Sequence, residues 1–549
     1  MADTGRPLLS GADFDLFCAG PVTTEVMAVL RRAQYGRRRL ALRALLDVAR
    51  RGGDRDAVER SWRLLADAEL SDPASVEDVL MAPAVGSWLA RTLREVVRVG
   101  GPAAGAGVLH AVAAAAAVRA GVPGRVTVPV AHGVVTLPTV GQCRAPAGAD
   151  TVELSVGDAG GPVLLDGAEP RFRPFHRHRS EARGLALEVG VDDVDPQRRF
   201  SAPAAPAPLD EDEYAHWCAV LDEAWTLLTG WHTGYAAELS AGLTSLVPLA
   251  PDSGAVGASS ATAFGAVALS TRGSVAEFAE TLVHELQHSK LNAVLDLVTL
   301  HEEGDDKRHY APWRDDPRPL TGVLHGLYAF VSVVEFWHGQ SPGSFALALR
   351  ARQLRLALDG LAGLRLTGMG RRLVAAVDRR LGACAPDPAA SPFTDLVDRI
   401  TADHRASWRV RHVRPRPEDV AVLADDWLAG RGPSAPVRGD VTAGTARAGA
   451  GRAALLRLRA LDPAGFAATR RTGADAAYAH DDFEDAARGY LDRLREEPDN
   501  GAAWVGLGLA TSAPALLDRP EVVRAVHAEV RARGARTPDP LRLAHWVAG

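Results

Sequence analysis

The sequence predicts a mainly α-helical protein with a mixed α+β N-terminal part, a helical core built around a metal-binding motif, and a C-terminal helical appendage. Apolar residues recur at helical spacing over most of the 549 residues, and strand-like alternation is concentrated in the N-terminal part. A chain of this length corresponds to roughly three or four domains. The predicted parts are an α+β region at 1–205, a metal-binding domain at 206–430, a linker at 431–451 and a helical region at 452–549.

Composition and charge narrow the class of protein. With 47% hydrophobic and 24% charged residues, the chain has the balance of an ordinary globular protein. A formal net charge of −6 gives no indication of nucleic-acid or membrane-surface binding. The four cysteines form no CxxC pair, no signal-peptide pattern is visible, and no apolar run approaches the roughly 20 residues of a membrane span. We therefore expect a cytoplasmic protein whose partners include neither nucleic acid nor membrane.

The first predicted elements are helices over residues 20–120. Apolar residues such as Leu30 and Leu45 lie at spacings compatible with amphipathic turns. The basic run from Arg31 to Arg43 is expected to form a solvated helix face.

Strand patterns begin at about Arg125. β-Branched residues lie on either side of His132-Gly133, which predicts a β-hairpin that turns at these two residues. The segments TVELSV, PVLLDG and GLALEVGVDDV continue in strand-like pieces. The region closes at SAPAAPAPLDEDE, a loop rich in Pro and Ala that we interpret as a domain edge.

The predicted metal-binding domain returns to helical spacing at residues 212–247. A Gly/Ser stretch and a short apolar strand, FGAVALS, follow. The next helix begins at Ser274, because Ser274 and Glu277 match the capping-box pattern. Another helix is predicted from about Leu320 to Trp337, and further helices continue to about residue 430.

The C-terminal region contains one helix pair with the small-residue and aromatic pattern of a tetratricopeptide repeat. In FEDAARGYLDRLREEPDNGAAWVGLGLA, the first helix is expected to end at Pro498-Asp499. One convincing repeat is present rather than an array. We interpret the region as a TPR-like appendage that either binds a protein partner or stabilises the fold.

The most informative segment is AEFAETLVHELQHSKLNAVLDL, which contains an HExxH motif. On a helix, His284 and His288 lie one turn apart on the same face, so both imidazoles can reach one metal ion. Glu285 lies beside them, where it could act on a metal-bound water or orient a neighbour. A short strand followed by a capped helix with this motif is the arrangement of zincin-like folds. The alternative is a pair of core histidines satisfied by hydrogen bonds.

A third ligand must come from elsewhere in the chain. The metzincin pattern is excluded, because Leu291 and Val294 occupy its Gly and His positions. His301 would lie roughly 20 Å beyond His288 on a continuous helix. The apolar helix LTGVLHGLYAFVSVVEFW offers two buried polar groups about 15 Å apart, so at most one of them binds the metal.

Of these two groups, we favour His325 over Glu335 as the third ligand. The alternative for His325 is a packed histidine bonded to a carbonyl. The alternative for Glu335 is an interior ion pair with an arginine of the preceding loop.

That loop, HYAPWRDDPRPL, contains a second group of candidate binding residues. Two prolines stiffen its backbone, and Arg314 or Arg318 could grip a carboxylate with the two-point fork of a guanidinium. The alternative is a structural lattice in which Asp315 and Asp316 tie the arginines down.

Together, HELQHSKLNAVLDL and YAPWRDDPRPLTGVLHGLYAF resemble the actinobacterial HExxH-motif proteins that form the family of α-ketoglutarate-dependent, HExxH-type peptide β-hydroxylases. The resemblance covers about Val256 to Gln340. HExxH alone is shared with zinc peptidases, whereas its combination with WRDDPRP and HGLYAF is much more specific.

The resemblance implies an Fe(II), 2-oxoglutarate- and O2-dependent dioxygenase that hydroxylates a β-carbon of a ribosomally made precursor peptide. It implies that His284 and His288 are iron ligands, with His325 as the third. Arg314 or Arg318 would anchor the carboxylate of 2-oxoglutarate.

Two other classes stay open. In a gluzincin-type zinc metallopeptidase, His284, His288 and Glu335 would bind zinc, and Glu285 would be the general base. In a non-catalytic scaffold, the C-terminal helices would serve as an interaction module. The intact HExxH motif argues against the scaffold, because a dead site has no reason to keep two buried histidines.

Overall fold

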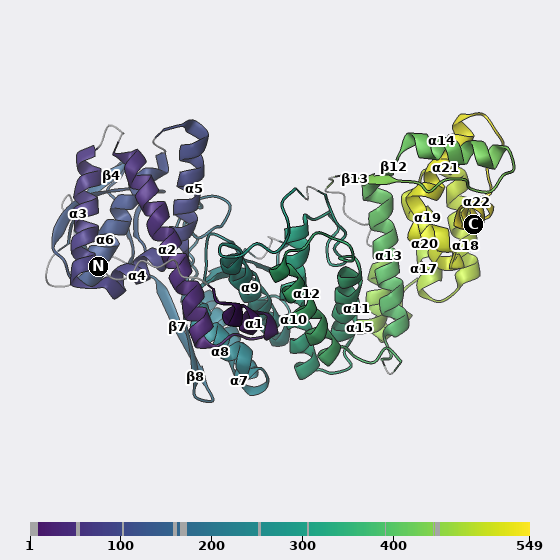
Figure 1. Ribbon diagram of the computed structural model, residues 1–549. Coiled ribbons are helices and arrows are strands. Elements are labelled where there is room, and N and C mark those ends of the chain that lie inside the picture. The colour runs from purple at the N-terminus through teal and green to yellow at the C-terminus, as the bar shows by residue number, and fades with distance from the viewer. Residues whose placement is uncertain are drawn as a thin grey trace. The chain divides into compact units, whose positions relative to one another are not determined.

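The computed structural model (Figure 1) describes residues 9–50, 55–101, 104–156, 162–164, 173–250, 254–304, 307–389, 391–442, 444, 451–470 and 472–549. About 60% of the chain is helical, which confirms the mainly α prediction. The chain divides into two units, Met1–Val298 and Thr299–Gly549, and each is described by itself. The boundary lies inside the predicted domain at 206–430, and the four-part division stays a prediction.

The first unit begins with the predicted helices. They are α1 (Gly11–Ala19), α2 (Thr24–Ala49), α3 (Arg55–Ser71), α4 (Pro73–Met81), α5 (Pro83–Val99) and α6 (Val108–Ala120). The alanine-rich α6 is buried among α3 and α4, because its small side chains allow close packing from several sides. The prediction that Arg31–Arg43 forms a solvated helix face is wrong for Arg38. This residue is 5% exposed and donates from Nη1 to the carbonyls of Leu80 (2.8 Å) and Ala82 (2.9 Å), at the end of α4.

Two small antiparallel sheets follow, in the orders β1-β4-β5 and β2-β3-β6. Their strands are β1 (Gly124–Pro129), β2 (Val134–Leu137), β3 (Gly141–Arg144), β4 (Thr151–Val156), β5 (Pro162–Leu164) and β6 (Arg173–Pro174). The turn predicted at His132-Gly133 exists, since both residues have positive φ, 55° and 74°. The predicted hairpin is wrong, because only one bridge, Ala131 to Val134, closes the turn. Strand β1 pairs with β4 over six residue pairs instead, which joins the buried valines of both strands.

A five-stranded mixed sheet is the centre of the rest of this unit, in the order β10-β11-β9-β8-β7. Its strands are β7 (His176–Ala182), β8 (Leu185–Val191), β9 (Ser245–Pro248), β10 (Gly257–Ala258) and β11 (Ala266–Leu269). Strands β8, β9 and β11 are parallel, whereas the edge strands β7 and β10 are antiparallel to their neighbours. Strand β11, the predicted FGAVALS strand, is buried at all four residues.

Three helices pack beside this sheet: α7 (Glu211–Trp231), α8 (Thr233–Gly242) and α9 (Val275–Leu295). The helical region expected at 212–247 is confirmed as far as Gly242, as two helices that meet at His232. Its last residues are wrong, because they enter strand β9. Helix α9 contacts α2, α7, α8 and β11, so it is buried on most sides.

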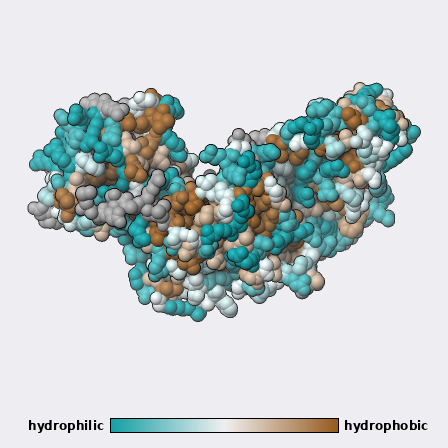
Figure 2. Space-filling model, in the orientation of Figure 1, coloured by the Kyte–Doolittle hydropathy of each residue, from teal (hydrophilic) through white to brown (hydrophobic). Residues whose placement is uncertain are grey.

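The second unit begins with α10 (Leu320–Gln340), α11 (Phe345–Asp359), α12 (Gly368–Cys384) and α13 (Thr394–His412). By length and composition α10 could cross a membrane, which corrects the expectation that no run of that length exists. However, 67% of its most apolar window is buried inside the protein, where it packs on α11 and α12. Hydrophilic residues cover much of the face that Figure 2 shows. Helix α10 therefore has the environment of a core helix.

The C-terminal helices share one hydrophobic core with α11 and α13. These elements are β12 (Val413–Pro415), α14 (Pro417–Leu428), β13 (Gly439–Val441), α15 (Gly451–Leu461), α16 (Pro463–Ala467), α17 (Ala474–Ala479), α18 (Phe483–Glu496), α19 (Gly501–Thr511), α20 (Pro514–Asp518), α21 (Pro520–Ala532) and α22 (Pro540–Ala548). The predicted helix pair is confirmed as α18 and α19, with the break at Pro498-Asp499. A third of the predicted linker 431–451, at 443 and 445–450, lies outside the described residues, and its described part contains β13.

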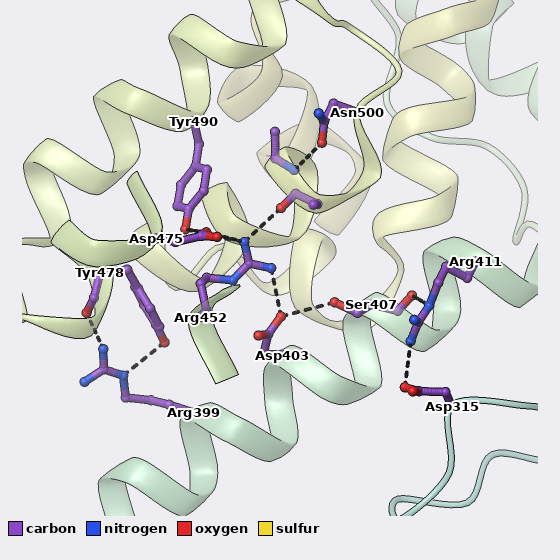
Figure 3. Close-up of polar contacts among 12 residues, drawn as sticks. Asp315, Arg399, Asp403, Ser407, Arg411, Arg452, Asp475, Tyr478, Tyr490 and Asn500 are labelled. Atoms are coloured by element: carbon purple, nitrogen blue, oxygen red, sulfur yellow. Dashed lines mark hydrogen bonds and ion pairs between the residues drawn. The ribbon is translucent and has the colours of Figure 1, made fainter. Parts of the chain in front are cut away.

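Buried arginines join α13 to the helices that follow it (Figure 3). Arg452 of α15 is 6% exposed and pairs with Asp403 (2.8 Å) and Asp475 (2.9 Å). Arg399 of α13 donates to the hydroxyl (3.1 Å) and the carbonyl (2.5 Å) of Tyr478. These contacts connect α13, α15 and α17, so the C-terminal helices are held by polar as well as apolar contacts.

Candidate metal centre

The HExxH motif lies in the middle of α9, as predicted. The helix begins where expected, because Ser274 and Glu277 form the reciprocal capping box. The Nε2 atoms of His284 and His288 lie 3.1 Å apart, and their rings meet at 86°. Two ring nitrogens of the same kind therefore converge on one point beside the helix.

This convergence fits a single metal ion. With metal–nitrogen bonds of about 2.1 Å, Nε2 atoms at this separation subtend an angle of about 95° at the metal. Neighbouring ligands stand at 90° in an octahedral shell and near 109° in a tetrahedral one, so either geometry needs little adjustment. Within the described residues of the first unit, no third His, Cys, Asp or Glu joins the pair.

Glu285 is the buried carboxyl of the motif, with 7% of its surface exposed. Its pKa is raised to about 7, because burial raises it more than the hydrogen bond from Ser259 lowers it. Ser259 follows β10 and donates from its hydroxyl to Oε2 at 2.6 Å. A side chain at Gly257 of β10 would meet Thr281 and the Glu285 carboxyl, so this glycine lets the edge strand approach the helix. The carboxyl is thus held between α9 and the end of β10.

A fully buried ion pair supports α9 on its other side. Lys290 of α9 and Glu238 of α8 are 0% and 1% exposed and bond directly to each other. Gln287 connects them, because it donates to Glu238 (2.7 Å) and accepts from Lys290 (2.8 Å). Glu238 also accepts from the backbone N–H of Val22 (2.8 Å), and the Lys290 ammonium lies 5.5 Å from the centre of the Phe17 ring. We call Lys290, Glu238 and Gln287 the lysine cluster.

Sequence reasoning missed the lysine cluster. A signal existed, because Lys290 is one of only two lysines in the chain and lies two residues after His288, directly before the apolar Leu291. Its partner is 52 residues away, so no local pattern could have identified it.

The other predicted site residues lie in the second unit. His325 is in the second turn of α10, and burial together with the nearby Arg318 lowers its pKa to about 4, which keeps the ring neutral at pH 7. The Arg318 guanidinium lies over Gly322, where an added Cβ would be 3.2 Å from Nε. His325 and Arg318 are thus neighbours, whereas completion of the histidine pair by His325 stays a prediction.

The WRDDPRP loop forms the Arg–Asp lattice considered as its structural alternative. Asp316 accepts from Arg314 Nε (2.8 Å) and Arg318 Nη1 (3.1 Å), and both arginines lower its pKa. Trp313 packs on Gly326 of α10, where any side chain would collide with its ring. Asp315 lies 3.4 Å from Arg411 of α13. The loop is therefore rigidly attached, while the Arg314 and Arg318 side chains remain 52% and 37% exposed.

Glu335 is occupied by an ion pair. Both of its carboxylate oxygens accept from Arg380 of α12, at 2.7 and 2.8 Å, and Arg380 also donates to Ser332 at 3.2 Å. The ion pair expected as an alternative exists, but its arginine comes from a later helix and not from the preceding loop. The continuous helix assumed for His301 is wrong, because α9 ends at Leu295, and the His301 ring bonds to the Thr321 hydroxyl at 2.7 Å.

Comparison with known proteins identifies no family for this chain. No protein-family model matches the chain, and no curated protein matches it in sequence. The geometry of α9 and α10 and the resemblance of the motifs are therefore the observations that bear on function.

The lysine cluster should control the stability of the first unit. In Lys290→Met, the Glu238 carboxylate is left buried without its counter-charge, so we expect a loss of about 3–5 kcal/mol in urea denaturation followed by circular dichroism. The exposed lysine gives a matched control, because Lys307→Met should change stability by less than about 0.5 kcal/mol. The double variant Lys290→Met with Glu238→Gln should recover part of the loss. Equal effects of the two single lysine variants would contradict this role.

The histidine pair should be required for metal binding. After reconstitution with Fe(II) or Zn(II), elemental analysis should find about one metal per wild-type chain, and His284→Ala or His288→Ala should each abolish this stoichiometric binding. Circular dichroism should show a retained fold. His301→Ala is the control and should keep its metal, since that ring bonds to Thr321. A full metal equivalent in both motif variants would disprove the assignment.

Proposed function

We propose that this protein is an Fe(II)- and 2-oxoglutarate-dependent dioxygenase that hydroxylates a β-carbon of a ribosomally made precursor peptide. The observation that carries the proposal is the convergence of His284 and His288 Nε2 atoms, 3.1 Å apart on a buried helix. The combined resemblance of the HELQH and WRDDPRP segments selects this oxygenase among the metal-dependent classes. Cytoplasmic localisation and a protein partner for the C-terminal helices belong to the same proposal.

The architecture of the first unit supports a zincin-like core. Helix α9 packs against the parallel strand β11, and the antiparallel edge strand β10 approaches α9 next to the motif. An extended peptide could bind along such an edge, because its backbone N–H and C=O groups are not all used within the sheet.

The contacts of the second unit favour His325 over Glu335 as the third ligand. Coordination by Glu335 would require its carboxylate to leave a two-point ion pair with a 7%-exposed arginine. A neutral imidazole at His325 needs no such rearrangement. Two histidines with a third histidine would leave open positions for a keto acid and O2.

Of the two candidate arginines, Arg318 is better placed to bind 2-oxoglutarate. It lies beside His325, whereas Arg314 is more exposed. Asp316 bonds to one side of the Arg318 fork, at Nη1, and so can orient the guanidinium toward an incoming carboxylate. Asp316 would then be a positioning residue.

The chain's own groups have distinct parts in the proposed reaction. When bound, an Fe(II) centre supplies the O2-activating redox chemistry that zinc lacks. The lysine cluster keeps α9 in place, and the Ser259 hydroxyl holds the Glu285 carboxyl beside the histidine pair. Arg318 would hold the keto acid by its carboxylate, and the buried helix faces would limit the access of water.

A gluzincin-type zinc peptidase is the second candidate. It is favoured by the position of Glu285, a buried carboxyl directly after the first ligand and held by Ser259, as a general base would be. The ion pair of Glu335 with Arg380 counts against it, because a gluzincin needs this carboxylate as a ligand.

The product distinguishes the two classes. Anaerobically purified protein should receive Fe(II), 2-oxoglutarate, air and a precursor peptide encoded beside its own gene. We expect an intact peptide heavier by one oxygen atom, with one succinate and one CO2 per hydroxylation, and we expect Zn(II) to inhibit. Mass spectrometry and succinate quantification give the result. Cleavage of the peptide with Zn(II), independent of 2-oxoglutarate, would establish the peptidase instead.

The third ligand can be tested separately by metal content. His325→Ala should weaken metal binding strongly, because one of three ligands is lost. Glu335→Gln should retain the metal but lower stability by about 2 kcal/mol, since Arg380 loses its charged partner. Elemental analysis and thermal melting of both variants measure these effects. Loss of metal only in Glu335→Gln would identify the carboxylate as the ligand.

A further inference from the structure

An arginine-lined cavity of about 450 Å³ lies in the second unit, and neither Arg314 nor Arg318 lines it. It is bordered by the C-terminal half of α13, the first residues of α15 and α19, and one residue of α21. Its charged lining consists of Asp403, Arg411, Arg414, Arg452, Asp475 and Arg524. We call it the arginine cavity, and part of it is visible in Figure 3.

The lining carries more positive than negative charge. Arg452 is neutralised by Asp403 and Asp475, and Arg411 lies 3.4 Å from Asp315. Arg414 donates only to the carbonyls of Val410 (3.4 Å) and Val413 (3.3 Å), and Arg524 to that of Asp499 (3.4 Å). Among the described residues, no carboxylate lies within 4.0 Å of either guanidinium.

The pKa of Arg524 agrees with this charge imbalance. Burial lowers it, and the positive charge of Arg414 lowers it further, whereas the carboxylates of Asp499 and Glu521 only partly compensate. The positive charges of Arg414 and Arg524 thus face the same cavity, and the nearby carboxylates neutralise them only in part. An anion in this space would relieve the repulsion.

One helix start adds to the positive potential. Helix α19, of eleven residues, begins at Gly501, which lines the cavity, whereas the Asp475 carboxylate already covers the start of α15 at Gly451. A Cβ at Gly501 would lie 3.7 Å from Arg524 Nη1, which places this guanidinium over the first turn of α19. Asn500 accepts from the N–H of Ala503 at 3.0 Å, which leaves the N–H groups of Gly501 and Ala502 as first-turn donors. Helix dipoles and N–H donors at such starts favour anions.

The geometry points to a binding site for a small, doubly charged organic anion, held by Arg414, Arg524 and the start of α19. The charge follows from the two arginines without carboxylate partners. The size follows from the volume, which is within the roughly 300–1,000 Å³ of small-molecule pockets and exceeds the needs of a lone inorganic ion. Guanidinium forks and helix N–H groups recognise both carboxylates and phosphates, so a phosphomonoester and a dicarboxylate are two sources of the same chemistry.

The full-length, metal-free protein in chloride buffer of constant ionic strength gives the test. Isothermal titration and thermal melting should be measured with glycerol 2-phosphate and with succinate as probes. We expect one to bind with a dissociation constant below about 1 mM and to raise the melting temperature, and stronger binding of one probe identifies the source. Absence of binding by both probes at 10 mM (roughly tenfold above that limit) would overturn the proposal.

Variants locate the binding. Arg414→Gln changes an exposed side chain and should weaken binding at least about tenfold without unfolding the protein, and Arg524→Ala should do the same. Arg488→Ala is the control, because this exposed arginine of α18 lies outside the cavity and pairs with Asp485 on its own helix. If Arg524→Ala does not fold, the affinity of Arg414→Gln gives the result. Unchanged affinity in Arg414→Gln, or an equal loss in Arg488→Ala, would refute the site. Because no metal is present, this result is independent of the proposed oxygenase activity.

Discussion

The position of the HExxH helix, α9, depends on the buried ion pair between Lys290 and Glu238. Burial of an ammonium and a carboxylate costs several kcal/mol per ion, and only a direct bond with further hydrogen bonds offsets it. The lysine cluster meets this condition, since Gln287 and the Val22 N–H occupy the remaining positions on Glu238. Any rotation of α9 would break several of these bonds at once. The same contacts that fix Lys290 therefore fix the direction of His284 and His288, on the adjacent turns.

Elsewhere the chain uses arginine for the same purpose. Arg380 joins α12 to α10 through Glu335, and Arg452 joins α15 to α13 and α17. A guanidinium can bond to several partners in different directions, so one arginine can connect three helices where an ammonium would give fewer fixed contacts. This explains how a partly buried carboxylate such as Glu335 can be structural even though its position in an apolar helix resembles that of a metal ligand.

Local patterns in the sequence were sufficient for much of the fold. The capping box of Ser274 and Glu277 located the start of α9 to the residue, because its two hydrogen bonds lie within four residues of each other. The turn at His132-Gly133 was equally local, but the partner of β1 is about 25 residues away and depends on which buried faces match. Long-range polar partners were not predictable in the same way. Glu335 was recognised as a buried polar residue, whereas Arg380 was not recognised as its partner, since helical periodicity carries no information on contacts 45 residues apart.

An HExxH helix alone does not determine which reaction a protein catalyses. Two histidines one turn apart supply two nitrogen ligands to zinc or to iron alike, and their 3.1 Å separation suits either coordination shell. The class of reaction must therefore depend on what surrounds the pair: the third ligand, the group that receives the co-substrate, and the disposition of Glu285. In this chain the carboxylate that a peptidase would need is bound to an arginine, and a neutral histidine lies beside a partly exposed guanidinium on the same helix and its loop. That combination suits a neutral third ligand and an anionic co-substrate better than it suits hydrolysis. Our proposal of an oxygenase over a peptidase thus rests on the partners of His325 and Glu335 and not on the motif itself.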